Sequence, residues 1–334
     1  METWLPGDAT VTSLGDPLAA AAIRAARPFI HPAFLDSPGF VSPMLSERAG
    51  VKVVVKLDCT NPIGAFKGRG TWLAVRRLAE DGLVGPKRPV VVASTGNFGQ
   101  GCAFAGRALG VAVVVFAHEG ANPTKLERIR AFGATVVEEG SDFDVAREAS
   151  ERYAGERDAV LLVDGADPWV ATGAGTLATE LTDAAGRGAL PHLRTAFVPV
   201  GNGALIVGVG AWLKAEARDC RVVGVQSDRA PSMTLSWRAK QPVQTETADT
   251  YAGGIATRVP VPEALEAMEG RVDDMVLVGD DELRAAQREL TSALGVTVEG
   301  GGAASWAAIR RAKAAGALAG PALVLVTGSN AEPG

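Results

Sequence analysis

Length, composition and charge limit the classes of protein to which this chain can belong. It has 334 residues, 47% of them hydrophobic, which is enough for a large core and for one or two domains. The formal net charge is −5 and the basic residues are dispersed, which argues against a nucleic-acid surface or a polybasic membrane segment. Cys59, Cys102 and Cys220 form no CxxC pair, so neither a disulfide framework nor a zinc site is predicted.

Neither the N-terminus nor any apolar run predicts membrane insertion. METWLPGDAT lacks a basic region followed by an apolar stretch. The longest strongly apolar run, VAVVVFA at 111–117, is too short to span a bilayer. We therefore expect a cytoplasmic protein.

Short apolar runs alternate with amphipathic segments along the chain. The predicted strands are 51–58, 89–94, 111–117, 134–139, 159–164, 196–201, 221–226, 274–279 and 322–328. The predicted helices are 71–82, 99–110, 123–133, 205–217 and 280–295. Continuous apolar runs suit strands covered on both faces, which predicts a mostly parallel sheet and an α/β fold. The first 45 residues are less regular, and we expect an arm that packs on a partner subunit.

Four loops are candidates for binding or catalysis. The first follows the strand at 51–58 and reads NPIGAFKGRG. Lys67 stands near the start of a predicted helix, directly after Phe66. The helix dipole and burial beside Phe66 would both disfavour its charge, which suits a lysine that forms a Schiff base. A lysine that extends from a helix end to solvent explains this loop alone equally well.

The second loop, STGNFGQG at 94–101, also joins a strand to a helix. It places two hydroxyls, an amide and free backbone N–H groups at a helix N-terminus, which favours a carboxylate or a phosphate. The residues are Ser94, Thr95, Gly96 and Asn97. An ordinary turn with an N-cap has the same composition.

The third and fourth loops are VPVGNGALIVG at 198–208 and LVTGSN at 325–330. In the third, a dinucleotide fingerprint would need glycine at Ile206, so a monophosphate fits better than a nicotinamide dinucleotide. A tight turn is the simpler alternative. In the fourth, Thr327 ends a strand, where a threonine is usually only a turn residue.

The order and spacing of the four loops resemble the fold-type II pyridoxal-phosphate (PLP) enzymes, most closely their serine/threonine dehydratase branch. The segments TYAGGIATR, DDELRAAQREL and VEGGGAASWAAI resemble later parts of that family. The resemblance implies two open, twisted, mostly parallel sheets in two domains, as in tryptophan synthase β-like proteins. The large PLP-binding domain would comprise 1–88 and 167–334, and a small mobile domain would comprise 89–166. It further implies a homodimer that acts on a small amino acid.

The same resemblance implies roles for particular residues. Lys67 would hold PLP as a Schiff base and remove the substrate's α-proton, with Phe66 packed beside it. Asn97 would hydrogen-bond the phenolic oxygen, and Thr327 would face the pyridine nitrogen. The substrate carboxylate would be bound by Ser94, Thr95, Gly96 and Asn97. The cofactor phosphate would lie against Gly201, Asn202, Gly203, Ala204 and Leu205.

Some residues depart from the family pattern. VPVGN and Thr327 are more similar to the corresponding residues of threonine synthases. Gln226 and Ser232 stand where relatives place acids that hold a cation, so no divalent metal site is expected. Glu299 either tunes the cofactor site or is a solvated residue at a strand end. The chain ends at Gly334, so the regulatory domain of biosynthetic threonine dehydratases is not expected.

The implied activity is that of an ammonia-lyase, which converts threonine or serine to a 2-oxo acid and ammonia by β-elimination. A neutral threonine at the pyridine nitrogen would favour this outcome by leaving the nitrogen unprotonated. The alternatives are a threonine synthase-like or β-replacing enzyme, an amino-acid racemase, and a catalytically silent binding subunit.

Overall fold

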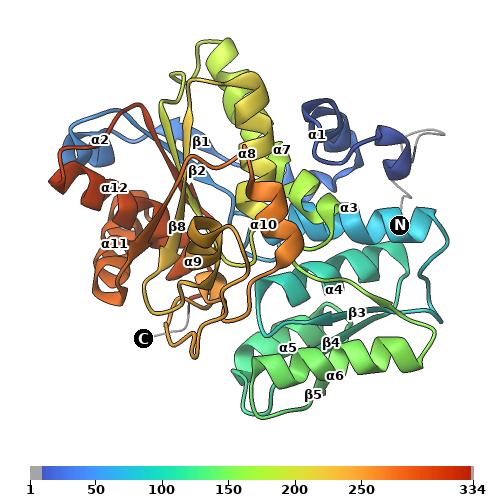
Figure 1. Cartoon of the computed structure of the whole chain (residues 1–334). Helices are drawn as coiled ribbons and strands as arrows, with labels where there is room; N and C mark the ends of the chain where they lie inside the picture. Colours follow the sequence, from blue (N-terminus) through green and yellow to red (C-terminus); the bar gives the residue numbers. More distant parts are fainter. Residues whose placement is uncertain (1–9, 332–334) are drawn as a thin grey trace.

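The computed structural model describes residues 10–331, which form two sheets with helices on both faces (Figure 1). The larger sheet has six strands in the order β1-β2-β10-β7-β8-β9. These are β1 (Gly39–Val41), β2 (Val53–Leu57), β7 (Thr195–Pro199), β8 (Arg221–Ser227), β9 (Asp274–Val278) and β10 (Ala322–Val326). Only β1 runs antiparallel to its neighbour.

The smaller sheet is wholly parallel, in the order β5-β4-β3-β6. Its strands are β3 (Val90–Ala93), β4 (Val113–Ala117), β5 (Thr135–Glu138) and β6 (Val160–Leu161). They lie within the predicted small domain, whose boundaries at 89 and 166 stay a prediction. The predicted fold class, α/β with two mostly parallel sheets, is confirmed.

The described α-helices are α1 (Ala20–Ala26), α2 (Pro43–Ala49), α3 (Lys67–Glu80), α4 (Asn97–Leu109), α5 (Pro123–Ala131), α6 (Phe143–Glu156), α7 (Pro168–Gly186), α8 (Ala204–Glu216), α9 (Ser232–Ala239), α10 (Pro262–Met268), α11 (Asp280–Leu294) and α12 (Ala304–Ala314). The short 3₁₀-helices are η1 (Val11–Leu14), η2 (Arg27–Phe29), η3 (Pro32–Phe34), η4 (Gly253–Ile255) and η5 (Gly301–Ala303). All nine predicted strands and all five predicted helices are present, with shifted ends.

Alternate residues of the central strands point into two different cores. Val53 and Val55 of β2 are buried in the cluster that includes side chains of α2, α11 and α12. Val54, between them, is buried in the cluster formed with α3, α7 and α8. Figure 1 shows these two groups of helices on opposite faces of the larger sheet. The continuous apolar runs therefore arise because each strand needs an apolar side chain on both faces.

The N-terminal segment packs on its own chain, and its expected contact with a partner subunit stays a prediction. Ile23, Ile30 and Phe34 are fully or almost fully buried in the core that includes α3 and α7. The Trp72 indole N–H donates to the Phe29 carbonyl at 2.8 Å. Residues 1–9, which hold nearly all of METWLPGDAT, lie outside the described residues.

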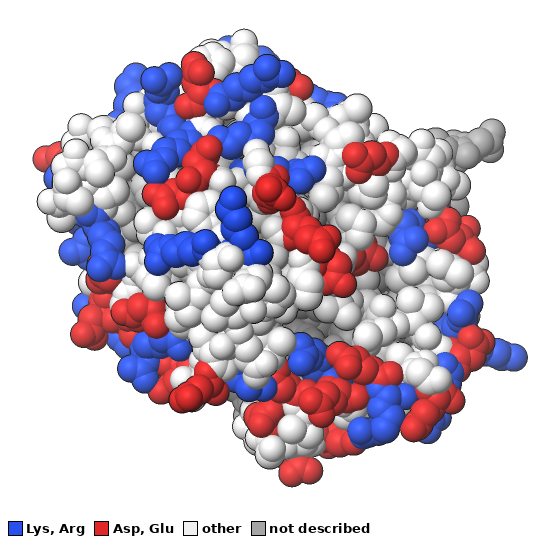
Figure 2. All heavy atoms as spheres, viewed as in Figure 1, with Lys and Arg blue, Asp and Glu red and all other residues white. Residues whose placement is uncertain are grey.

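The visible surface carries both signs of charge. Figure 2 shows lysine and arginine side chains mixed with aspartate and glutamate over the face in view. Among residues 10–331, no helix has both the length and the apolar character needed to cross a membrane.

Candidate active site

The four predicted loops all follow the carboxyl end of a parallel strand. The lysine loop follows β2, the STGN loop follows β3, the glycine loop follows β7, and the C-terminal loop follows β10. In open α/β sheets, ligands bind outside this edge. Hydrogen bonds join the loops directly: Phe66 N–H donates to the Thr327 carbonyl at 3.0 Å, and the Asn330 amide donates to Asn97 Oδ1 at 2.7 Å.

Lys67 is the first residue of α3, and its amine points into the molecule. Nζ lies 2.6 Å and 2.8 Å from the two carboxylate oxygens of Asp164. It also lies 4.8 Å from the centre of the Phe66 ring and 5.7 Å from that of Phe98. The side chain is only 15% exposed, so Lys67 does not extend to solvent.

The glycine loop is connected to the lysine through Asp164. Asn202 Nδ2 lies 3.5 Å from Asp164 Oδ2, and Asn202 Oδ1 accepts from the Thr257 hydroxyl at 3.2 Å. Gly203 precedes α8 with φ of +101°, where a Cβ would come within 2.7 Å of Ala264 Cβ. Glycine at this position opens the start of α8, whose first backbone N–H groups have no intrahelical partner. This is the geometry of a monophosphate site.

The STGN loop forms the start of α4. The Ser94 hydroxyl accepts from the N–H groups of Gly96 and Gly99, at 3.2 Å and 3.0 Å, and so holds the turn in shape. Asn97 Nδ2 donates to Glu299 Oε1 at 2.9 Å. The predicted roles of Ser94, Thr95, Gly96 and Asn97 toward substrate and cofactor stay predictions.

Glu299 lies inside the site rather than at a solvated strand end. Its N–H donates to the Gly328 carbonyl at 3.0 Å, and a Cβ on Gly328 would come within 1.9 Å of Glu299 Oε1. Gly328 therefore leaves the space that the Glu299 carboxyl occupies. Burial raises the pKa of Glu299 above its ordinary value, although the Asn97 hydrogen bond acts in the opposite sense.

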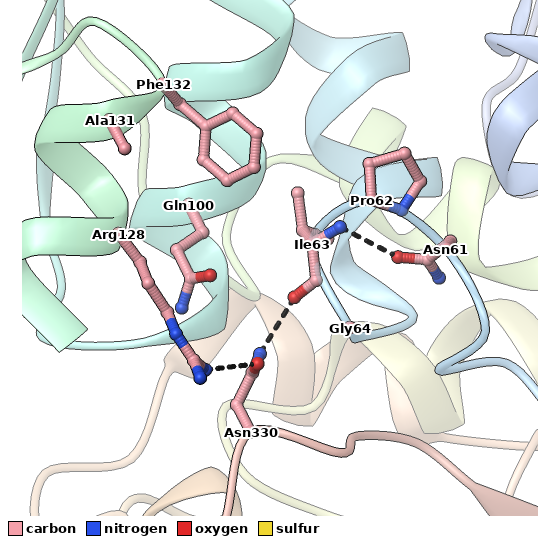
Figure 3. A pocket seen from close by; sticks show the side chains of 9 residues that line it. All are labelled: Asn61, Pro62, Ile63, Gly64, Gln100, Arg128, Ala131, Phe132 and Asn330. Carbon is pink, nitrogen blue, oxygen red and sulfur yellow. Dashed lines mark hydrogen bonds between the residues drawn. The ribbon is translucent and has the colours of Figure 1, made fainter. Parts of the chain in front are cut away.

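A cavity of about 350 Å³ lies between the lysine loop and the helices of the smaller sheet (Figure 3). Asn330 forms part of its wall, donating to the Ile63 carbonyl at 2.8 Å and accepting from Arg128 at 2.6 Å. The lining residues are Asn61, Pro62, Ile63, Gly64, Gln100, Arg128, Ala131, Phe132 and Asn330. Because Asn330 also bonds Asn97, the cavity and the STGN loop share one side chain.

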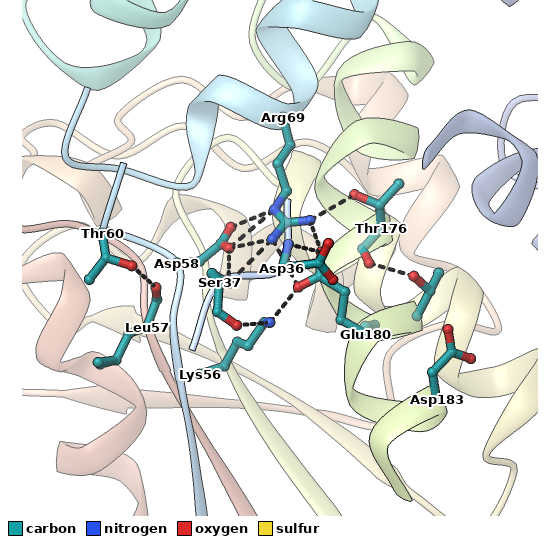
Figure 4. Close-up of polar contacts among 12 residues, drawn as sticks. Asp36, Ser37, Lys56, Leu57, Asp58, Thr60, Arg69, Thr176, Glu180 and Asp183 are labelled. Atoms are coloured by element: carbon teal, nitrogen blue, oxygen red, sulfur yellow. Dashed lines mark hydrogen bonds and ion pairs between the residues drawn. The ribbon is translucent and has the colours of Figure 1, made fainter. Parts of the chain in front are cut away.

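A buried ionic network supports the lysine helix from below (Figure 4). Arg69, two residues after Lys67, bonds the carboxylates of Asp58 at 2.7 Å and Glu180 at 2.6 Å. Lys56 forms an ion pair with Glu180 as well. Two cations and two anions are thus neutralised together, which ties β2, α3 and α7 to one another beneath the site.

Gln226 and Ser232, where relatives place acids that hold a cation, form hydrogen bonds through their uncharged side chains. Gln226 Oε1 accepts from both the N–H and the hydroxyl of Thr234, each at 2.9 Å. The Ser232 hydroxyl donates to the Thr257 carbonyl at 2.6 Å. Within residues 10–331, no group of three or more His, Cys, Asp or Glu side chains is arranged to hold a metal ion.

The main residue that sequence reasoning missed is Asp164. It lies just beyond the carboxyl end of β6, in the same sheet as the strand before the STGN loop, and that position is the signal that could have found it. Asn330 is the second, although it stands in the quoted LVTGSN loop.

An enclosed lysine amine close to a helix start that is open to a monophosphate is typical of α/β enzymes that hold a phosphorylated carbonyl cofactor. The open start of α8 fits the phosphate, and the enclosed amine of Lys67 fits the carbonyl. The chain belongs to the family described as pyridoxal-phosphate dependent enzymes, whose profile matches residues 31–328. The predicted relationship and the predicted cofactor are thereby confirmed.

Three relatives show the range of this similarity. An L-threonine ammonia-lyase of Thermotoga maritima is 35% identical over 80% of this chain and 65% of its own length, so the chain spans just under two thirds of that relative. A processed threonine deaminase isoform 2 of Solanum lycopersicum has a TM-score of 0.83 at 28% identity, covering 90% of this chain and 85% of the other. A maize serine racemase has a TM-score of 0.84 at 25% identity, covering 94% of each chain.

Proposed function

We propose that the protein is a PLP-dependent ammonia-lyase that eliminates the β-hydroxyl of threonine or serine and yields a 2-oxo acid and ammonia. The observation that carries this proposal is the position of Lys67 between the two sheets: its amine lies 5.7 Å from the ring of Phe98 in α4 and is connected through Asp164 to Asn202, just before α8. The threonine ammonia-lyase and threonine deaminase among its relatives support the same reaction.

The chain's own groups divide the work as follows. The start of α8, with Gly201, Asn202 and Gly203, binds the cofactor phosphate through backbone N–H groups. The start of α4 binds the substrate carboxylate. When bound, PLP withdraws electrons from the substrate's α-carbon, which acidifies the α-proton. Lys67 Nζ takes that proton, and the ring of Phe66, whose centre is 4.8 Å away, helps to exclude water from the amine.

A racemase is the second candidate, favoured by the likeness to maize serine racemase. Racemisation needs an acid on the face opposite Lys67, and Thr95 is the residue of the STGN loop that would serve. Its β-methyl restricts χ1 and crowds the α-carbon, so proton return from that side is slow. Elimination needs no second acid on that face and is therefore the favoured outcome.

The test is a panel of amino acids and O-phosphorylated or O-acylated amino acids, with 2-oxo acid, ammonia and new amino acids measured separately. Lys67→Ala should lose the cofactor absorbance and nearly all turnover, about 100-fold or more, while its circular dichroism is unchanged. Retention of both signals in Lys67→Ala would remove the lysine from its assigned role. Turnover of only the phosphorylated or acylated substrates would favour the synthase-like alternative.

A cytoplasmic homodimer remains part of the proposal. All three cysteines are free and buried, which suits a reducing compartment. Phe40 and Met44 are 37% and 45% exposed near the edge strand β1, where a second copy could cover them. Analytical ultracentrifugation at micromolar concentration measures the oligomeric state, and a monomer there would contradict the dimer.

A further inference from the structure

Asp164 is held against Lys67 by the fold. It stands just beyond β6, and both of its carboxylate oxygens lie within 2.8 Å of Lys67 Nζ. Gly165, the next residue, has φ of +94°, and a Cβ there would come within 2.3 Å of the Asn202 carbonyl oxygen. The turn after Asp164 is therefore packed tightly against the glycine loop, which fixes where the carboxylate points.

Two other titratable groups act on the amine of Lys67. They are Cys102 in α4 and Glu299 in the segment before η5, which both interact electrostatically with Lys67. Burial raises the pKa of both groups, which disfavours their anions. Neither forms the short contact with Nζ that Asp164 forms. Two aromatic rings also surround the amine, and they weaken screening by water.

We propose that Asp164 is the counter-ion of Lys67, a positioning residue that holds Nζ in place and stabilises the lysine nitrogen whenever it carries a proton, both in its bond to the cofactor and after it has taken the substrate's α-proton. This inference rests on the proposed function of Lys67 as the cofactor's lysine. An opposite charge at this distance favours the charged form of its partner. Asp164 also places Nζ on the side of the glycine loop, through its contact with Asn202.

The counter-ion gives Asp164 a part in the elimination itself. The α-carbon–hydrogen bond breaks and its proton passes to Lys67 Nζ, which becomes an ammonium beside the Asp164 carboxylate. The electron pair left by the proton then forms the double bond between the α- and β-carbons as the β-carbon–oxygen bond breaks with its own pair on oxygen. The ammonium returns its proton to that oxygen, which leaves as water, and Lys67 is again a free amine. Hydrolysis of the unsaturated amino acid then consumes one water and releases the 2-oxo acid and ammonia, so no oxidant or reductant is needed.

The test uses the cofactor-loaded enzyme and compares Asp164→Asn with Asp167→Asn. Asp167 lies three residues further on and bonds the Trp169 N–H at 2.8 Å as the N-cap of α7, a role that asparagine keeps. The readout is a pH titration of the visible absorbance band, which reports protonation of the lysine–cofactor bond. In Asp164→Asn the midpoint should fall by about one pH unit or more. In Asp167→Asn it should match the wild type.

Turnover gives a second readout. Asp164→Asn should lower kcat by about tenfold or more with a smaller effect on KM, because the proposal assigns the substrate carboxylate to the start of α4 and not to Asp164. Asp164→Glu retains the charge and should retain the wild-type midpoint even if its turnover is reduced. An unchanged midpoint in Asp164→Asn, or equal shifts in the asparagine and glutamate variants, would overturn the inference. If Lys67→Ala kept the band, the proposed function of Lys67 would fail instead.

Discussion

Glu299 shows how one side chain links the site to stability. Burial raises its folded pKa above the ordinary value of 4.5, so the native state binds the proton more tightly than the unfolded chain does. The stability contributed by this proton is complete below pH 4.5 and is lost as pH rises through the folded pKa. At neutral pH the ionised Glu299 therefore lowers the stability of the fold. Buried ionisable groups that reduce stability in this way are typical of functional sites.

Glu299→Gln should therefore stabilise the protein without cofactor at about pH 8, since glutamine cannot ionise and can still accept from Asn97. The gain is about 1.4 kcal/mol for each pH unit by which burial raises the pKa. Thermal unfolding from about pH 4 to pH 8 measures this gain in stability. The comparison is Glu289→Gln, because Glu289 also accepts a hydrogen bond, from the Trp306 indole N–H at 2.8 Å. The two curves of wild type and Glu299→Gln should meet at acid pH. Parallel curves over the whole range would show that Glu299 does not titrate as described.

At the scale of elements, the lysine helix is held by charge as well as by apolar packing. Arg69 is 1% exposed and bonds two carboxylates that are themselves 2% and 6% exposed. Removing one member of such a network leaves a buried charge without compensation. The network therefore fixes the start of α3, and with it the position of Lys67.

Arg69→Met should lower the free energy of unfolding by about 3–5 kcal/mol, because the buried Asp58 carboxylate then lacks its cationic partner and Glu180 keeps only Lys56. Arg130→Met is the matched control. Arg130 pairs with Glu138 at 2.6 Å, but the two side chains are 44% and 41% exposed, so the loss should be below about 1 kcal/mol. Urea unfolding of both variants measures the difference. Equal losses would mean that the buried network does not hold the helix.

Elements with a strong local pattern could be predicted from the sequence, and elements without one could not. The strands buried on both faces gave continuous apolar runs. Helix α7 is buried almost all round, so PWVATGAGTLATELTDAAG has no amphipathic stripe and was missed. Strand β1 was missed because it is a short, exposed edge strand.

The site divides in the same way. Lys67 and the three other loops could be found because each combines glycine or hydroxyl residues with a strand end. Asp164 could not be assigned a partner, since its contact with Lys67 spans 97 residues of sequence. The hydrogen bonds that join Asn97 to Glu299 and to Asn330 could not be predicted either, because they connect segments far apart in the sequence.

For the whole molecule, the neutral network around Gln226 predicts activity without a divalent metal. Its side-chain oxygen already accepts two hydrogen bonds from Thr234, whereas Mg²⁺ prefers carboxylate oxygens. A chelator should leave both the rate and the melting temperature unchanged. Loss of activity on chelation, with recovery on adding Mg²⁺ or Mn²⁺, would contradict this prediction.

The two sheets meet around the cofactor site, and the reaction outcome reports on that arrangement as a whole. In the proposed reaction Lys67 would approach the α-carbon from one face, and Thr95, on the loop after β3, is the residue assigned to the opposite face. If Thr95 returns a proton poorly, the α-carbon loses its β-substituent instead. The balance between the two products therefore tests the proposed chemistry more directly than any single rate.

The deciding measurement is proton NMR of the reaction of L-serine and L-threonine in D₂O, with Lys67→Ala as the blank. We predict that 2-oxo acid and ammonia accumulate well ahead of any α-deuterated D-amino acid. Dominance of the deuterated D-isomer would make Thr95 a working acid and the protein a racemase.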